Sequence, residues 1–140
     1  MQTLIERDDE SFVSLCPELN IASQGSSVEE AQANLVEALT LFFETADPSE
    51  VTRRFHSEIF GLRFPLGKLR VLSGSELYRI LEQNAFVEVR QRGSHRIMQK
   101  RFDGSTITVP VPLHDTIHRG TLSSIVRQSE LPRSLFESTD

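Results

Sequence analysis

The sequence has one cysteine, no tryptophan, one tyrosine and no long apolar segment. A single cysteine cannot form an internal disulfide, and we expect Cys16, between Leu15 and Pro17, to be an inert, packed thiol in a reducing compartment. No apolar run approaches the roughly 18 residues of a membrane span. The first residues, MQTLIERDDE, do not resemble a signal peptide. We therefore expect a globular, cytoplasmic protein that does not contact membranes.

Recognisable metal sites are also scarce. His114 and His118 are four residues apart but lack a convincing third ligand. The run Asp8-Asp9-Glu10 is more typical of a hairpin turn than of a magnesium site. The sequence therefore predicts neither a metal nor another cofactor.

Charge divides the chain into two halves. Residues 1–60 hold 3 of the 15 basic side chains and 12 of the 20 acidic ones, whereas residues 61–140 hold the other 12 basic and 8 acidic ones. A length of 140 residues fits either one ordinary domain or two small ones, and two such small domains would stabilise each other. The asymmetry predicts a nucleic-acid-binding half and an acidic half able to cover it.

The predicted fold class is α+β, and the first half reads as three strands, a long helix, a short helix and a further strand. Apolar residues between polar turns predict short strands over 2–6, 11–16 and 20–24. A short second helix over 49–57 precedes the last predicted strand, over 59–66.

The main helix of this half begins after Ser27, which has the spacing of a capping box with Glu30. It ends at Asp47-Pro48. Its apolar stripe, expected to pack on the strands, consists of Val28, Ala31, Leu35, Ala38, Leu39 and Phe42. The glutamates outside the stripe, which we expect to be mostly solvated, are Glu29, Glu37 and Glu44.

The second half, residues 67–140, reads as α-β-β-β-α. Ser73 and Glu76 form another capping-box pair, and Asn84 is expected to end that helix in a left-handed conformation. Turns at 93–94 and 103–104 separate strands predicted over 86–92, 95–102 and 105–111. Pro110 and Pro112 lack the N–H of a central strand and place the end of the third strand at a sheet edge or beyond the paired residues. The last helix begins at Gly120-Thr121, carries Leu122, Ile125 and Val126 inward and ends before Pro132.

His95 is the principal candidate for catalysis. RNA carries its own nucleophile, the 2′-hydroxyl, so its cleavage requires proton transfer and stabilisation of phosphate charge, and histidine titrates in the right range. The residues expected to bind RNA phosphates near it are Arg90, Arg92, Gly93, Ser94, Arg96 and Lys100. His114 and His118, in the loop before the last helix, are candidates for a second acid or base. From these residues alone, a histidine beside a turn in a basic hairpin is more often a surface residue than a catalyst, and loop histidines such as His114 and His118 are more often simply solvated.

Several sequence blocks of the second half resemble the HicA toxin family of bacterial mRNA interferases over about residues 68–136. They are Leu72-Ser73-Gly74, Arg90-Gln91-Arg92-Gly93-Ser94-His95, Val109-Pro110-Val111-Pro112-Leu113-His114 and Gly120 to Gln128. The resemblance implies a fold similar to a double-stranded RNA-binding domain and metal-independent cleavage by His95. Two positions depart from the family pattern: Arg96 stands where many members have a second histidine, and Ala85 where a glycine is usual.

The first half resembles the HicB antitoxin over about residues 1–66. The matching blocks are Leu15 to Leu19, Ala22-Ser23-Gln24-Gly25, Glu29-Glu30-Ala31 and Asn34 to Ala38. The resemblance implies a truncated ribonuclease-H-like unit of the order β-β-β-α-β without catalytic activity. Many HicB proteins end in a DNA-binding domain, and because nothing after Leu66 resembles one, we do not expect this chain to bind DNA.

These observations lead to one principal hypothesis and two alternatives. The principal one is a toxin–antitoxin module in one chain, in which residues 1–66 hold an mRNA-cleaving ribonuclease at residues 67–140 inactive. Inhibition occurs within one chain or by exchange between two, and we expect a homodimer. The alternatives are an RNA-binding module without catalytic activity and a permanently silenced fusion.

Overall fold

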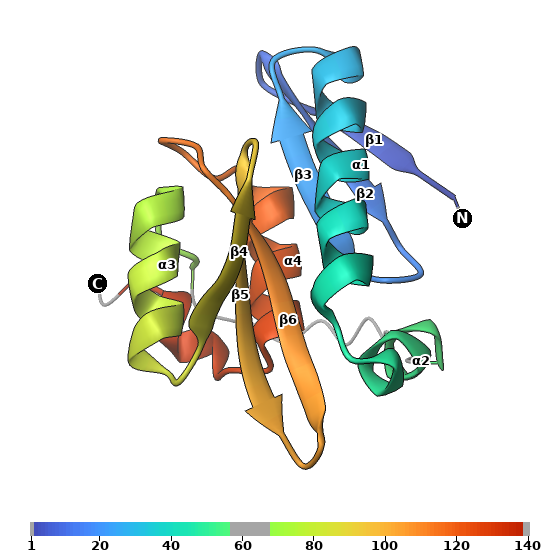
Figure 1. The fold of residues 1–140 in the computed structure, drawn as a ribbon. Coiled ribbons are helices and arrows are strands. Elements are labelled where there is room, and N and C mark those ends of the chain that lie inside the picture. Colours follow the sequence, from blue (N-terminus) through green and yellow to red (C-terminus); the bar gives the residue numbers. More distant parts are fainter. Residues whose placement is uncertain (1, 57–67, 139–140) are drawn as a thin grey trace.

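The computed structural model describes residues 2–56 and 68–138 (Figure 1). Two small α+β units follow one another along the chain. The N-terminal unit has the order β-β-β-α-α and the C-terminal unit the order α-β-β-β-α, followed by a short 3-10 helix. Within the described residues, no helix has the length and apolarity needed to cross a bilayer.

The N-terminal unit is a three-stranded antiparallel meander with a long helix packed on it. Its strands are β1 (Leu4–Asp8), β2 (Ser11–Cys16) and β3 (Ile21–Gly25), paired in that order. Helix α1 (Val28–Thr45) begins at Ser27, whose hydroxyl accepts from the Glu30 amide. The predicted reciprocal bond is absent, because the Glu30 carboxylate accepts from the amide and hydroxyl of Ser26 instead.

The apolar stripe of α1 confirms the predicted packing. Ala31, Leu35, Ala38 and Phe42 are buried, whereas Val28 and Leu39 are only partly buried. A core of Cys16, Leu19, Ile21, Leu35, Ala38 and Phe42 joins this helix to the strands. The predicted second helix is α2 (Pro48–His56). The strand predicted over 59–66 lies outside the described residues.

The C-terminal unit packs two helices on one face of an antiparallel sheet. The elements are α3 (Gly74–Gln83), β4 (Val87–Arg92), β5 (His95–Phe102), β6 (Ser105–Pro112) and α4 (Arg119–Ser129), and the sheet order is β4-β5-β6. The three strands and two helices confirm the predicted order, and β6, with its prolines, is an edge strand. The reciprocal capping box of Ser73 and Glu76 also forms.

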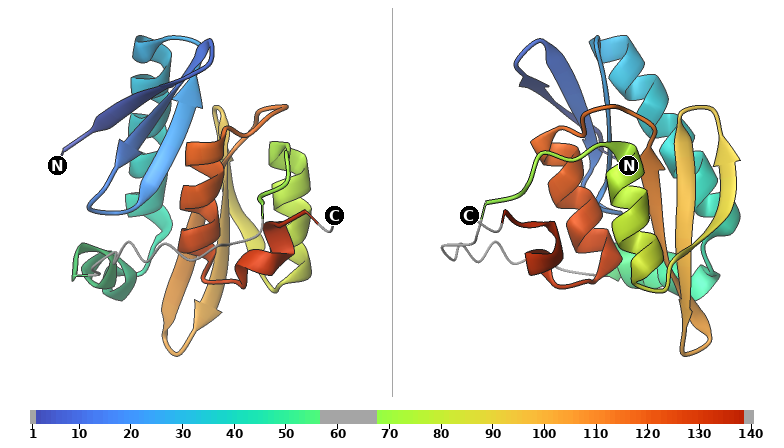
Figure 2. Two further views of the ribbon diagram at one scale, coloured as in Figure 1. Left: turned by 180° about the vertical axis from the view of Figure 1, so that it is seen from behind. Right: turned by 90° about the vertical axis from the view of Figure 1, so that its left-hand side faces the viewer.

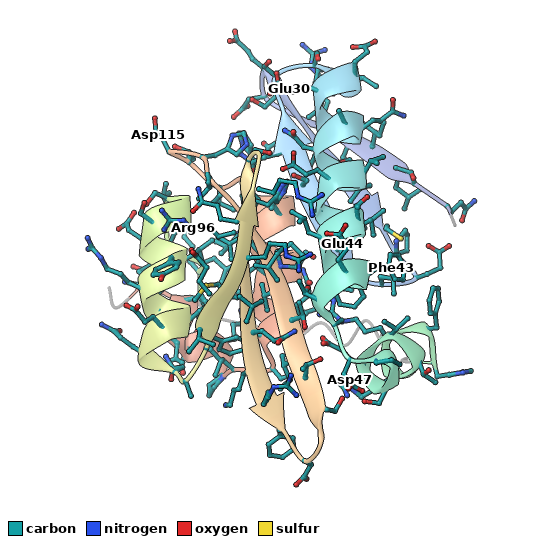
Figure 3. All side chains as sticks on the ribbon, in the orientation of Figure 1. Glu30, Phe43, Glu44, Asp47, Arg96 and Asp115 are labelled. Atoms are coloured by element: carbon teal, nitrogen blue, oxygen red, sulfur yellow. The ribbon has the colours of Figure 1, made fainter. Side chains whose placement is uncertain are left out.

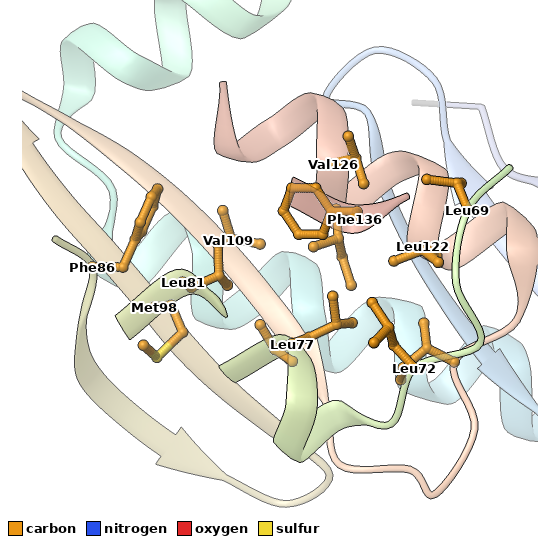
Figure 4. Packing of buried hydrophobic residues seen from close by; sticks show 13 residues of the cluster. Leu69, Leu72, Leu77, Leu81, Phe86, Met98, Val109, Leu122, Val126 and Phe136 are labelled. Carbon is orange, nitrogen blue, oxygen red and sulfur yellow. The ribbon is translucent and has the colours of Figure 1, made fainter. Parts of the chain in front are cut away.

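The core of this unit has a component that the sequence did not predict. Phe136, in the 3-10 helix η1 (Arg133–Phe136), is fully buried among residues from both helices and the sheet (Figure 4). The C-terminal segment is fixed further by bonds from the Arg70 amide to the Phe136 carbonyl and from the Ser138 amide to the Lys68 carbonyl.

The end of α3 corrects one prediction. Asn84 is the C-cap, but its φ of −117° is not left-handed. Ala85, the next residue, has the left-handed φ of 74° instead. The departure from the glycine that is usual at this position in HicA sequences therefore falls on a residue whose side chain is disfavoured by its backbone conformation.

The two units pack against each other through both their helices and their sheets. β3 lies between α1 and α4, and α1 and α2 lie beside β6 (Figures 1 and 2). Along β5, Arg96, Met98 and Lys100 face α3 and its core, while His95 and Gln99 face α1. The face of the C-terminal sheet opposite α3 and α4 is therefore occupied by the N-terminal unit.

Candidate active site

His95 is the first residue of β5 and follows the tight turn that joins it to β4. Gly93 in this turn has a φ of 58°, which favours glycine. The turn is fixed by a bond from the Leu113 amide to the Ser94 carbonyl, 2.7 Å long. The side chain of His95 is fully buried although it lies at the end of a hairpin. The burial arises because α1 and β3 lie over it.

Both ring nitrogens of His95 contact the N-terminal unit. Nδ1 lies 2.7 Å from Oε1 of Glu37, on α1, and Nε2 lies 3.0 Å from Oγ of Ser23, on β3. The Glu37 oxygen also accepts from the amide and the hydroxyl of Ser94, at 2.8 and 2.9 Å. These contacts define the site: an imidazole, a serine and a carboxylate from two different units.

The protonation states follow from these contacts. Burial lowers the pKa of His95, opposed by the hydrogen bond and charge of Glu37, and repulsion from His114 lowers it further. Burial alone would raise the pKa of Glu37, but its bonds from His95 and Ser94 lower the pKa overall. The lowered pKa of His95 and the lowered pKa of Glu37 both agree with a neutral imidazole beside an ionised carboxylate. Nδ1 then donates to Glu37, and Nε2 accepts from the Ser23 hydroxyl.

Two of the predicted RNA-binding arginines lie next to this site. Arg90 and Arg92, both on β4, pair with the same oxygen of Glu44, and the Arg90 contact measures 2.8 Å. Glu44 lies on the side of α1 that faces these strands (Figure 3). Both arginine side chains stay about half exposed, at 41% and 54%. A carboxylate therefore occupies the position between two guanidinium groups that a phosphate would fit.

The other two predicted cations do not join His95. The Arg96 guanidinium lies over the Tyr78 ring of α3, 4.9 Å from its centroid, on the opposite face of the sheet. The Lys100 ammonium lies 5.9 Å from the centroid of Phe86, on that same face. The alternation of side chains along β5 separates them from His95, an effect that the linear motif conceals.

The two remaining histidines have different surroundings. His114 acts electrostatically on His95, and its carbonyl accepts from the amide of Gly74. His118 is the N-cap of α4, and its Nδ1 lies 3.2 Å from Oδ2 of Asp8, the last residue of β1. Its amide donates to Gln24 of β3. Of the two, only His114 has a described interaction with His95.

A second cluster of contacts joins the units away from His95. Glu50, on α2, is fully buried and accepts from both the amide and hydroxyl of Thr108 and from the hydroxyl of Thr106, both on β6. Arg54, one turn later, pairs with Glu50 at 2.9 Å and donates to the carbonyls of Leu19 and Thr108 and to the Gln128 side chain. We call this cluster the α2 anchor.

Apart from the partners of the α2 anchor on β6 and α4, the contact residues that the sequence did not predict belong to the N-terminal unit. Ser23 and the α2 anchor give no local signal. Glu37 and Glu44 do give one, because a spacing of seven residues is two helical turns and puts both carboxylates on one flank of α1. Glu29 and Glu44 are exposed, as expected for most of these glutamates, but Glu44 also pairs with Arg90 and Arg92, and Glu37 is partly buried against His95.

Among the described residues, no group of three or more histidine, cysteine, aspartate or glutamate side chains could hold a metal ion. A surface depression of about 260 Å³ is lined by Asp8, Lys68, Arg70, His118 and Arg119, among others.

Comparison with known families identifies the C-terminal unit. The family described as HicA toxin of bacterial toxin-antitoxin matches residues 74–131. The comparison gives no HicB family match for the N-terminal unit. Neither the curated proteins nor the solved structures give a match. The α-β-β-β-α order agrees with the fold of HicA toxins, which resembles a double-stranded RNA-binding domain and belongs to mRNA-cleaving endoribonucleases. Residues 74–131 therefore form a HicA toxin domain.

Proposed function

We propose that this chain is a toxin–antitoxin module in which the C-terminal unit, residues 67–140, is a metal-independent mRNA endoribonuclease that uses His95. The N-terminal unit, residues 1–66, is its inhibitor and a relative of the HicB antitoxin. The observation that carries this proposal is the burial of His95, with Glu37 on one ring nitrogen and Ser23 on the other.

The proposed reaction needs only groups that RNA and this unit provide. His95 accepts the proton of the 2′-hydroxyl while its oxygen bonds to phosphorus, and the bond from phosphorus to the 5′-oxygen breaks. The proton finally resides on that 5′-oxygen, which leaves a cyclic phosphate and a free 5′-hydroxyl. The Ser23 hydroxyl supports this role, because it lies 3.0 Å from Nε2, the reach at which a general base takes a proton. His114 is the nearer candidate for the second acid or base.

Arg90 and Arg92 are the proposed binding groups for a neighbouring phosphate. Two guanidinium groups that share one carboxylate oxygen of Glu44 are spaced to share a phosphate oxygen as well. The N-terminal unit thus inhibits by placing anions where the RNA backbone would lie, and opposite charges at such an interface favour fast and specific association.

The inhibition acts within one chain in the arrangement described above. The homodimer expected from the sequence belongs to the same proposal, because linked units can exchange partners between two chains. Exposed apolar side chains of the N-terminal unit are available for contact between copies: Leu4, Val36, Phe43 and Phe55. Sedimentation velocity should give the mass of two chains, and a single species of one chain would contradict the dimer without affecting the catalytic assignment.

The catalytic assignment is tested with a full-length variant that carries Glu37→Ala and Glu44→Ala, which we call the opened variant. With a chelator present, it should cleave RNA, and adding His95→Ala should abolish cleavage. Glu29→Ala, which removes an exposed charge from the same helix, is the matched control. Introduced alone into the wild-type chain, it should not change the rate of RNA cleavage. Cleavage that survives His95→Ala would reject the role of His95, and RNA binding without cleavage would favour the non-catalytic module.

A further inference from the structure

Three donors of the C-terminal unit converge on the carboxylate of Glu50, far from the ring of His95. Its Oε1 accepts from the hydroxyls of Thr106 and Thr108, at 2.7 and 2.6 Å, and its Oε2 accepts from the Thr108 amide at 2.8 Å. We infer that, once the N-terminal unit separates, these donors of β6 bind a phosphodiester group of the RNA away from the bond that is cleaved. The inference rests on the proposed function and adds a binding site to it.

The C-terminal unit itself directs two of these donors outward. β6 is an edge strand, and the Thr108 amide donates to Glu50 instead of to a further strand. The side-chain amide of Gln99, on β5, donates to the Thr108 hydroxyl oxygen at 3.0 Å. Because that oxygen already accepts from Gln99, its proton is directed to another acceptor. Both donors of Thr108 would therefore keep their direction without Glu50.

The acceptor that the N-terminal unit supplies is a charged one. Glu50 is fully buried and has Arg54 beside it, although buried ion pairs often add little stability because both charges lose their hydration. Glu37, Glu44 and Glu50 follow one another along α1 and α2, and each accepts from donors of the C-terminal unit. A phosphodiester carries negative charge on two non-bridging oxygens, as a carboxylate does on its two oxygens. The same donors can therefore bind either group.

The register of the sheet separates this site from the chemistry at His95. Thr108 lies opposite Gln99, which is the fourth residue after His95 on β5. At about 3.3 Å per residue, the site lies about 13 Å from His95 along the strand. It therefore takes a phosphate other than the cleaved one and makes no contact with the imidazole. Thr106 and Thr108 are binding residues in this account, and they align the RNA relative to His95.

The test requires a chain in which the donors are free. We add Glu50→Met and Arg54→Met to the opened variant and call the product the released variant. Both residues are replaced because a lone charge would stay buried, whereas apolar replacement of a whole buried pair is often tolerated. The probe is a single-stranded RNA with 2′-O-methyl groups, which keeps the phosphates and lacks the nucleophile.

Binding of this RNA should be visible at Thr108 itself. In the released variant, titration should shift the backbone amide resonance of Thr108 in a saturable way, and the wild-type chain should show no such shift. Adding Thr108→Val should weaken binding about tenfold, because a bond to an ionised group is lost. Thr108→Ser should retain binding, and Thr40→Val, at an exposed threonine of α1, should have no effect. Equal affinity after Thr108→Val, or an unmoved Thr108 amide, would overturn the inference.

Salt dependence separates a direct contact from a loss of structure. Thr108→Val should weaken binding by the same factor at low and high salt, because a neutral donor releases no counterion. Arg90→Ala should instead reduce the slope of log affinity against log salt by about one. A reduced slope for Thr108→Val would show that the substitution disturbs the cationic contacts, and it would count against a phosphate bond at Thr108.

RNA with free 2′-hydroxyls distinguishes this inference from the proposed function. With chelator present, the released variant should cleave it, and Thr108→Val should raise KM about tenfold with a smaller change in kcat. If His95→Ala abolishes cleavage while Thr108→Val changes neither binding nor KM, the threonine site is wrong and the proposed function stands. If cleavage survives His95→Ala, the proposed function fails, and the titration with 2′-O-methyl RNA decides alone whether Thr108 binds the RNA backbone.

Discussion

His95 is a histidine that the fold keeps neutral. It accepts a hydrogen bond from Ser23 on one side and donates one to Glu37 on the other, within a fully buried position. A neutral imidazole costs little to bury when both nitrogens are bonded, whereas an imidazolium would need to lose its hydration. The docked arrangement therefore depends on pH through this residue.

The first prediction concerns that dependence. Because the folded-state pKa of His95 lies below its ordinary value of 6.5, the unfolded chain takes up a proton that the folded chain refuses as the pH falls below 6.5. Stability should therefore decrease between about pH 7.5 and about pH 5.5, measured as the free energy of urea unfolding. His95→Gln should lose less stability over this interval. Since the other three histidines are common to both proteins, parallel pH curves would show that His95 does not contribute.

The second prediction concerns the left-handed residue Ala85, which is exposed and has a φ of 74°. A Cβ atom at this φ destabilises the folded state by about 1–2 kcal/mol. Glycine removes this strain, but it also stabilises the unfolded chain through its greater conformational entropy, which offsets part of the effect. Ala85→Gly should therefore stabilise the protein by about 0.5–1 kcal/mol in urea unfolding. Ala33→Gly, at an exposed interior position of α1, should destabilise it by about 1 kcal/mol. A loss of stability in both variants would contradict the account of this turn.

The sequence predicted the role of some site residues and not of others. The position of His95 after a glycine turn followed from local chemistry and from the family motif. The roles of Glu37 and Ser23 did not, because they depend on packing between segments 58 and 72 residues apart in the sequence. Arg96 failed to join the site for a simpler reason, since adjacent residues of a strand point to opposite faces.

Helix α2 matters at the scale of elements because it joins the units independently of the His95 site. Its Glu50 is bonded to the backbone and side chain of Thr108, and its Arg54 lies on the same network with only 10% of its side chain exposed. Buried ionised groups of this kind are strongly destabilising when one partner is removed, because the other stays buried without its counter-charge.

The third prediction follows from this network. Glu50→Ala should lower the free energy of unfolding by about 3 kcal/mol, since Arg54 keeps its buried position but loses its carboxylate. Glu29→Ala, at an exposed glutamate, should change it by less than about 0.5 kcal/mol. The coupling between positions 50 and 54, measured with the double variant, should be larger than that of an exposed pair such as Arg53 and Glu130, 3.7 Å apart. Equal losses for the two glutamates would show that the anchor is not a buried pair.

Most elements were predictable because their signals are local. Capping serines, the apolar stripe of α1 and the turns between strands can be recognised from a few neighbouring residues, and these elements lie within about two residues of their predicted positions, with β1 at Leu4–Asp8 instead of 2–6. The short helix η1 was not predicted, since Phe136 is ordered by a distant core rather than by its own neighbours. The left-handed position was misplaced by one residue, from Asn84 to Ala85, a shift that residue preference alone cannot resolve.

The whole molecule is organised around the sheet of the HicA toxin domain. Helices α3 and α4 cover one face, and the N-terminal unit occupies the face that carries His95 (Figures 1 and 2). The charge asymmetry in the sequence anticipated that an acidic half would lie against Arg90, Arg92 and His95. It did not indicate the α2 anchor, because that contact depends on a buried carboxylate and two threonines rather than on net charge.

The two contact regions predict different consequences for the whole chain. Loss of Glu37 and Glu44 removes anions from the candidate active site and leaves the α2 anchor in place. The opened variant should therefore remain folded, with its units linked through the α2 anchor, while α1 and β3 separate more readily from the face that carries His95 and give RNA access to it.

The central claim, that the acidic unit silences the ribonuclease, is tested most directly by comparing RNA cleavage by the wild-type chain and the opened variant in the presence of chelator. The account predicts a rate at least about tenfold higher for the opened variant, because two carboxylates no longer compete with phosphate at charge-assisted contacts. Equal rates for the two proteins, whether both cleave RNA or neither does, would contradict it.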